Sequence, residues 1–223
     1  MSKKTEGYFV QTKQYILEMA FRLFLKNGFC AVSLNEVIRE ADVTKGCFYH
    51  YFKGKEALIY DVIVTYLYDY LKSPLEAFQN WAKQQKNMDI AEALHFCYTF
   101  MPELILESGE RIPFREVQFL IYEGMKHYDY LQRESCICSR KQRILLKELL
   151  EKAKQQRLVQ RDIDTEEYAT TIMALRDGMI ALHILDSSID TKQKWESTFL
   201  SIWNKIKTEQ NQMICHKEGY LYA

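Results

Sequence analysis

Residues 33–52 read SLNEVIREADVTKGCFYHYF and predict two short helices separated by a tight turn. Ser33 and Glu36 have the spacing of a capping box, in which the serine hydroxyl accepts a backbone N–H and the glutamate accepts the serine N–H. A second N-cap, Thr44, precedes a helix that begins at Lys45. Two short helices in this order have the spacing of a helix-turn-helix, whose second helix enters the major groove of DNA.

The second of these helices is crowded with aromatic rings. Phe48 and Phe52 share one face and are expected to anchor the helix in a core. Tyr49, His50 and Tyr51 extend beyond that core and carry hydrogen-bonding groups suited to phosphates. Short helix pairs also occur in plain helical bundles, and a crowded aromatic helix is more often core than binding surface. The spacing alone therefore leaves both interpretations open.

The residues on either side of this pair fit the same arrangement. Apolar residues recur every three to four positions over 16–24 and predict a helix that ends at an Asn-Gly pair, where Gly28 can adopt the left-handed conformation. Lys55 is expected to open the next helix, where its ammonium and the helix N-terminus can bind a phosphate. Residues 1–60 contain nine Lys or Arg and six Asp or Glu, a net charge of about +3 in a chain of zero net charge.

The composition predicts an all-α protein. The chain has 223 residues, of which 48% are hydrophobic and 27% charged, with only 8 Gly and 3 Pro. Residue types that favour helix predominate. There is no signal-peptide core and no run of about 18 apolar residues, so we expect a cytoplasmic protein without membrane contact. The six Cys lack the spacing of a disulfide scaffold and are expected to be free thiols.

The run from residue 21 to 59 resembles the N-terminal DNA-binding domain of the TetR family of bacterial transcriptional regulators. The motifs that carry the resemblance are ADVTKGCFYHYF at 41–52 and GKEAL at 54–58. The similar region covers about a quarter of the chain. Asp42 replaces a common Gly in the turn, and Cys47 replaces a common Thr or Ser at a position that faces the bases.

The resemblance implies a helix-turn-helix DNA-binding domain at residues 1–56, with its motif at about 33–52. It implies a C-terminal helical domain at 57–223 that binds an effector and dimerises, giving about nine helices in all. The residues implied to contact DNA phosphates are Ser33, Thr44, Tyr49, His50 and Lys55. Those implied to lie near the bases, where sequence is read, are Lys45, Gly46 and Cys47.

Beyond residue 55, apolar periodicity predicts further helices. The first runs from Lys55 to Pro74, where proline is expected to kink or end it. The others are expected at 89–107 with a bend at Pro102, at 113–132 and 134–156, and from Thr191 to Ile206. Between the last two, Asp164 to Glu167 form a second capping signature, which begins a helix that ends before Asp186. Residues 108–110 are expected to form a turn.

The last two of these helices are the candidate dimer interface. An apolar stripe is more often intramolecular core than interface. However, a helix-turn-helix protein generally needs two DNA-binding domains, here called heads, about one DNA turn apart. The family also dimerises through its last two helices, so the resemblance favours a homodimer. The candidate interface residues are Leu175, Met179, Leu182, Trp195, Phe199, Ile202 and Trp203.

The candidate effector pocket rests on an unusual content of aromatic and methionine residues between residues 89 and 156. Pockets are mostly apolar with a few polar groups that orient the ligand. Ordinary core packing is the alternative for any one of these side chains. The candidate pocket residues are Phe96, Phe100, Met101, Phe119, Tyr122, Glu123 and His127.

These observations predict a ligand-responsive repressor that binds a palindromic operator as a homodimer and is released by an unknown small apolar or aromatic effector. One alternative is a redox sensor, in which thiols such as Cys47 control contact with DNA. Another is a helical enzyme or carrier with a vestigial head. No catalytic motif is present, and Cys136-Ile-Cys138 lacks the partners of a zinc site, so we expect no enzymatic activity, cofactor or metal.

Overall fold

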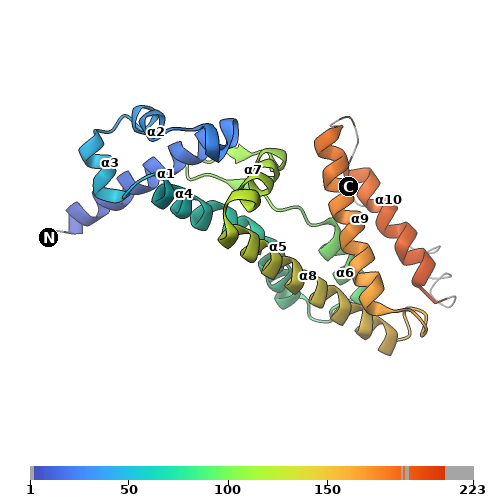
Figure 1. Cartoon of the computed structure of the whole chain (residues 1–223). Helices are drawn as coiled ribbons and strands as arrows, with labels where there is room; N and C mark the ends of the chain where they lie inside the picture. Colours follow the sequence, from blue (N-terminus) through green and yellow to red (C-terminus); the bar gives the residue numbers. More distant parts are fainter. Residues whose placement is uncertain (1–2, 187, 189–190, 209–223) are drawn as a thin grey trace. The chain divides into compact units, whose positions relative to one another are not determined.

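A computed structural model describes residues 3–186, 188 and 191–208, and Cys215 lies outside this part of the chain. The elements are α1 (Lys3–Ala31), α2 (Leu34–Glu40), α3 (Lys45–Tyr51), α4 (Lys55–Val62), the π-helical turn η1 (Ile63–Leu67), α5 (Tyr68–Gln84), α6 (Ile90–Thr99), β1 (Leu104–Ile105), β2 (Arg111–Ile112), α7 (Phe114–His127), α8 (Asp129–Gln155), α9 (Thr165–Leu185) and α10 (Thr191–Ile206) (Figure 1). Because α4, η1 and α5 follow one another without a break, they count as one helix, and the described residues form nine helices. The predicted all-α class is confirmed.

The chain divides into two compact units. Unit 1 comprises Met1–Ser73 and Pro102–Ile137, and unit 2 comprises Pro74–Met101 and Cys138–Ala223. Each unit has its own hydrophobic core. These units are defined by compactness and do not coincide with the predicted domains, because unit 1 contains the helix-turn-helix together with residues 102–137. The boundary after residue 56, which separates a DNA-binding from an effector-binding domain, therefore stays a prediction. Among the described residues, no helix combines the length and apolar character that a membrane span requires.

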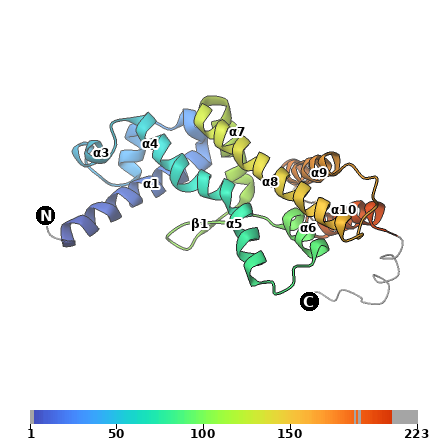
Figure 2. The same cartoon turned by 90° about the horizontal axis from the view of Figure 1, so that it is seen from below.

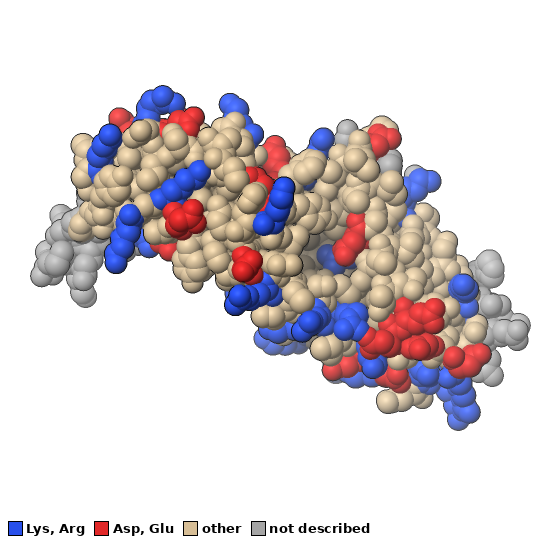
Figure 3. All heavy atoms as spheres, in the orientation of Figure 1, with Lys and Arg blue, Asp and Glu red and all other residues tan. Residues whose placement is uncertain are grey.

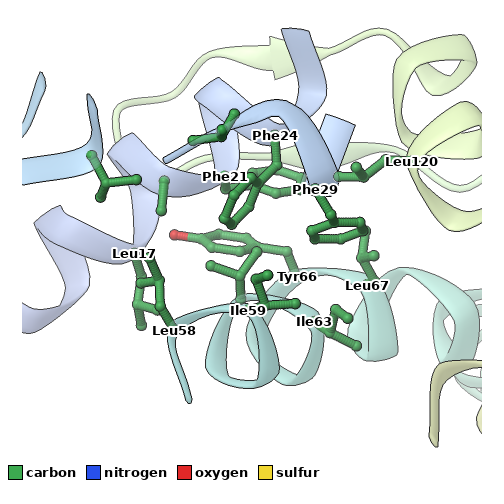
Figure 4. Close-up of a cluster of buried hydrophobic side chains, with 14 of the residues drawn as sticks. Leu17, Phe21, Phe24, Phe29, Leu58, Ile59, Ile63, Tyr66, Leu67 and Leu120 are labelled. Atoms are coloured by element: carbon green, nitrogen blue, oxygen red, sulfur yellow. The ribbon is translucent and has the colours of Figure 1, made fainter. Parts of the chain in front are cut away.

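The core of unit 1 lies between α1 and the continuous helix formed by α4 and η1 (Figure 4). Phe21 stacks on Tyr66 with ring centroids 4.3 Å apart, and Leu120 of α7 belongs to the same cluster. With seven residues each, α2 and α3 are too short to be stable alone. They join this core through buried side chains that include Val37 and Phe48. The core thus fixes the position of the helix-turn-helix.

The segment from Phe100 to Glu107 is not helical, so the predicted helix at 89–107 is wrong beyond Thr99. A residue that precedes proline avoids the helical region, and the proline itself has no N–H to donate. The helix accordingly ends at Thr99, three residues before Pro102. The chain then forms the β1–β2 hairpin, whose turn includes Gly109 at a φ of 84°.

The hairpin is fastened to α1 within unit 1. Arg22 donates to Glu18 (2.9 Å) and to Ser108 (3.1 Å), and it forms an ion pair with Glu110. Apolar side chains of the segment, Leu104, Leu106 and Ile112, are buried in the same core as α1. The sequence analysis did not predict this hairpin, because strands of only two residues are too short to show the alternation of apolar and polar residues that indicates a strand.

Pro74 was expected to kink or to end its helix. It lies inside α5, which continues to Gln84, so the helix does not end there. A proline in a helix leaves the carbonyl four residues earlier without its N–H partner. That carbonyl belongs to Tyr70, and the Ser73 hydroxyl donates to it at 2.8 Å. The neighbouring serine therefore satisfies the acceptor that the proline leaves.

Unit 2 is built from α6, α9, α10 and the parts of α5 and α8 that belong to it. Figure 2 shows α6, α9 and α10 next to one another. Trp195, Phe199 and Trp203 of α10 are buried in the core of this unit, at 5%, 6% and 8% exposure. The capping signature at Asp164 is confirmed, because its carboxylate accepts the N–H groups of Glu166 and Glu167. The other expected boundaries differ by a few residues, with α7 ending at His127 and α8 beginning at Asp129.

Candidate DNA-binding interface

The capping box predicted at the start of α2 is present. Ser33 Oγ accepts the N–H of Glu36 at 3.3 Å, and the Ser33 N–H donates to Glu36 Oε2 at 2.7 Å. The pKa of the Glu36 carboxyl lies below its usual value, because hydrogen bonds from Ser33 favour the charged form. The backbone N–H of Ser33 makes the larger contribution and its hydroxyl the smaller one. The cap thus remains formed at neutral pH, with the Ser33 side chain exposed.

The turn between α2 and α3 passes through Asp42 at a φ of 48°. This is the left-handed region, which glycine enters freely and which aspartate tolerates better than most other residues. The aspartate that replaces the family's common glycine is therefore compatible with the turn. The Val43 N–H bonds back to the Ile38 carbonyl at 3.2 Å and fixes the exit of the chain toward α3.

The helix α3 has a buried face and an outward face. Thr44 Oγ1 accepts the N–H of Cys47 at 3.1 Å and caps the helix as predicted. Phe48 and Phe52 are buried, at 0% and 1% exposure, with ring centroids 5.4 Å apart. Tyr49, on the outward face, is 54% exposed. The expectation that the two phenylalanines anchor the helix is confirmed.

The residues assigned to base contact lie at the leading turn of α3. Lys45 and Gly46 are exposed, and Cys47 is half-buried. A Cβ built on Gly46 would meet only Thr44 Oγ1, at 3.9 Å. Packing within the chain therefore does not require glycine at this position. A glycine here leaves the backbone open to close approach by a molecule outside the chain.

His50 and Lys55, the remaining residues assigned to phosphate contact, lie at the two sides of the α3–α4 connection. His50 is exposed, and its ring lies edge-on to Tyr51 at 5.0 Å. Lys55 begins α4 and donates from Nζ to the carbonyl of Cys30, at 3.2 Å. Because an ammonium has three donors, this bond leaves Lys55 able to bind a phosphate as well.

Basic side chains on unit 1 are scattered rather than continuous. In the view of Figure 3, the Lys and Arg side chains over α1 to α4 are separated by uncharged residues and by Asp or Glu. This agrees with the small positive balance of residues 1–60. Such a surface favours binding through a few placed contacts over indiscriminate attraction to polyanions.

The candidate pocket residues are divided between the two units. Phe96, Phe100 and Met101 are half-buried in unit 2. The four others lie on α7 in unit 1, where Phe119 and Tyr122 are 49% and 46% exposed. His127 is also exposed, whereas Glu123 is half-buried and accepts the N–H of Cys30 at 3.3 Å. The pocket therefore stays a prediction, and Glu123 has a structural contact that sequence reasoning missed.

The candidate dimer residues also separate into two groups. Leu175 and Leu182 of α9 are 38% and 50% exposed, and Met179 between them is half-buried. On α10, Ile202 is half-buried, but the two tryptophans and Phe199 belong to the core of their own unit. Those three aromatic side chains therefore pack within the chain. Of the candidate residues, those with exposed side chains, Leu175 and Leu182, both lie on α9.

A capped α2, a tight turn and an α3 with a buried and an outward face define a helix-turn-helix protein. Residues 16–62 match the family model described as "Bacterial regulatory proteins, tetR family". The chain is 31% identical over 142 residues to the probable HTH-type transcriptional regulator YttP of Bacillus subtilis, covering 55% of this chain and 69% of YttP. The chain belongs to the TetR family of bacterial regulatory proteins.

Other relatives are similar mainly over the head. The HTH-type transcriptional repressor NemR of Escherichia coli is 42% identical over 57 residues, which is 26% of this chain and 27% of NemR. The chain spans between 20% and 29% of the length of several curated relatives of this kind. A TetR-family transcriptional regulator from Cytophaga hutchinsonii has the same fold, with a TM-score of 0.61 and 21% identity over 94% of this chain and 98% of that one.

Proposed function

We propose that this chain represses transcription by binding a palindromic DNA operator as a homodimer, and that a small apolar or aromatic effector releases it. The observation that carries DNA binding is the two-faced helix α3. Its phenylalanines are buried in the core of unit 1, while Lys45, Gly46 and Tyr49 remain exposed. A helix held in this way can present its leading turn to the major groove.

The caps of α2 and α3 support the assignment of Ser33 and Thr44 to phosphates. Each hydroxyl caps its helix by accepting a backbone N–H and is exposed, and a Ser or Thr hydroxyl can donate to a phosphate oxygen. Tyr49, His50 and Lys55 add donors on the same head. In this proposal these contacts position the protein, while Lys45, Gly46 and Cys47 select the sequence.

The surface of α9 supports a homodimer. One side of the helix, including Ile172 and Ile184, is buried in unit 2. The opposite side exposes Leu175, Leu182 and Leu185, the last of them 82% exposed. A helix that is apolar on both sides needs a partner for each. A second copy of α9 supplies the same apolar surface, as two-fold symmetry requires.

A row of stacked rings in unit 2 supports an aromatic or apolar effector. Phe96 lies between Trp81 and Phe100, with centroid distances of 5.2 and 5.4 Å and interplanar angles of 18° and 22°. All three rings are half-buried. Flat rings stacked in this way offer a surface to another flat, apolar molecule. Release then requires that the effector bind the two states of the protein with different affinities.

The described cysteines give no additional support to redox sensing, which stays an alternative. Cys136 is exposed and Cys138 is buried, and residues two apart on a helix point to opposite sides. These two thiols therefore cannot approach to disulfide distance while α8 is intact. Burial raises the pKa of Cys97 to about 12, so this thiol is not a reactive thiolate at neutral pH.

Changing Gly46 to alanine tests the proposed approach of DNA to α3. The new methyl group has space within the chain, and alanine is the better helix former, so stability should rise by up to about 1 kcal/mol. Operator affinity should fall at least about tenfold, because the methyl group occupies space assigned to DNA. Thermal unfolding and titration of a fluorescent operator measure the two effects. Unchanged affinity in the stabilised variant would contradict the assignment of α3 as the helix that contacts the bases.

A further inference from the structure

The carboxylate of Glu123, on α7, lies directly over a break in α1. The break is at Gly28, whose φ is 79° and ψ is 164°. A Cβ built on Gly28 would lie 2.5 Å from Glu123 Oε2 and 2.9 Å from Oε1. The positive φ favours glycine here, and a Cβ at this position would force the Glu123 carboxylate to shift. The helical turn that follows the break therefore begins against an acidic side chain.

Both backbone polar groups of Cys30, just beyond the break, are engaged by charged side chains. A turn that follows a helix break has N–H groups without helical acceptors. Glu123 Oε1 accepts the Cys30 N–H, with the two atoms 3.3 Å apart. The Cys30 carbonyl accepts from Lys55 Nζ at 3.2 Å. The backbone of Cys30 thus connects an acid on α7 to a base at the start of α4.

This connection matters because Lys55 has a long, flexible side chain. Holding such a side chain in one place has an entropic cost that weakens any contact it makes. The hydrogen bond from Lys55 Nζ to the Cys30 carbonyl reduces that cost, provided that the carbonyl is itself held in place. The Glu123 carboxylate fixes Cys30, and two further N–H donors of Lys55 remain for a phosphate.

We propose that Glu123 is a positioning residue for the phosphate contact of Lys55, acting through the backbone of Cys30. The inference rests on the proposed binding of DNA by this head. A purely Coulombic role has the opposite sign, because an acidic group near a phosphate site opposes DNA and its removal would strengthen binding. Positioning requires that its removal weaken binding. The direction of the change therefore distinguishes the two roles.

The experiment compares the full-length wild type with Glu123→Ala, using a duplex that the wild type selects from random DNA. Affinity should fall about tenfold for each head, the loss typical of a hydrogen bond to a charged group, and therefore about 100-fold for the dimer. The plot of log affinity against log salt should become shallower by up to about 1.8, since two heads lose one phosphate contact each. In a Lys55→Met background, the Glu123→Ala change should produce no further loss.

Glu116→Ala is the matched control, because it removes an exposed carboxylate from the same helix and should leave affinity and salt slope unchanged. Circular dichroism checks folding, and if Glu123→Ala does not fold, Glu123→Gln should show a smaller loss in the same direction. Binding as tight as the wild type, an unchanged salt slope, or losses that add in the Lys55→Met background would overturn the inference. A wild type that selects no duplex would overturn the proposed function, and this inference with it.

Discussion

Changing Leu182 to glutamate is expected to separate the proposed dimer into monomers and to lower operator affinity by about 1,000-fold or more. Leu182 is 50% exposed on the outer side of α9, where the proposal places the second copy. Two copies of a buried glutamate would face each other across a symmetric interface, without partners for their charges. A single head retains only half of the contacts to a palindrome. Analytical ultracentrifugation and operator titration measure the two consequences.

Ile144→Glu is the matched control for this change. Ile144 is 53% exposed on α8, so it also places a glutamate at an exposed apolar position of unit 2, outside the proposed interface. This variant should remain dimeric and bind the operator as the wild type does. A Leu182→Glu chain that sediments as a dimer would show that α9 is not the interface. A monomer that keeps full affinity would show that operator binding does not need two joined heads.

Changing Phe48 to alanine should lower the free energy of unfolding by about 3–5 kcal/mol, the range for removing a fully buried phenylalanine. Phe48 is 0% exposed and is the only side chain of α3, within its helical limits, that is fully buried. A helix of seven residues has little stability of its own, so α3 should lose its position together with this anchor. Urea unfolding, followed by circular dichroism, measures the change.

Tyr49→Ala provides the comparison, since it removes a ring from the next residue, whose side chain is 54% exposed. Its effect on the free energy of unfolding should be within about 0.5 kcal/mol, as for most surface substitutions. Its operator affinity should nevertheless fall, because Tyr49 is assigned to a phosphate. If Phe48→Ala were as stable as Tyr49→Ala, the unit 1 core would not hold α3 in the way described.

Features that depend on neighbouring residues could be predicted from the sequence. The caps at Ser33 and Thr44 and the helix break at Gly28 each rest on chemistry within three or four residues of chain. The family motifs at 41–52 and 54–58 extended the prediction to the whole DNA-binding domain. Its buried phenylalanines and outward tyrosine followed from the periodicity of a helix.

Features that depend on distant residues could not be predicted. Glu123 and Cys30 are 93 positions apart, and nothing near either residue indicates the bond between them. The apolar face of α10 was assigned to a dimer because periodicity shows that a face is buried, but not by what. Trp195 and Trp203 in fact pack within unit 2. The hairpin after Pro102 likewise depends on its contacts with α1, through Arg22, and not on strand propensity.

The most direct test of the proposed function is selection of bound duplexes from random DNA by the full-length chain, with affinity followed against salt. A homodimeric operator-binding protein should select one palindromic sequence, with half-sites about one helical turn apart and a steep salt dependence that reflects several phosphate contacts at each head. Binding that is weak and indifferent to sequence, at every salt concentration tested, would contradict it.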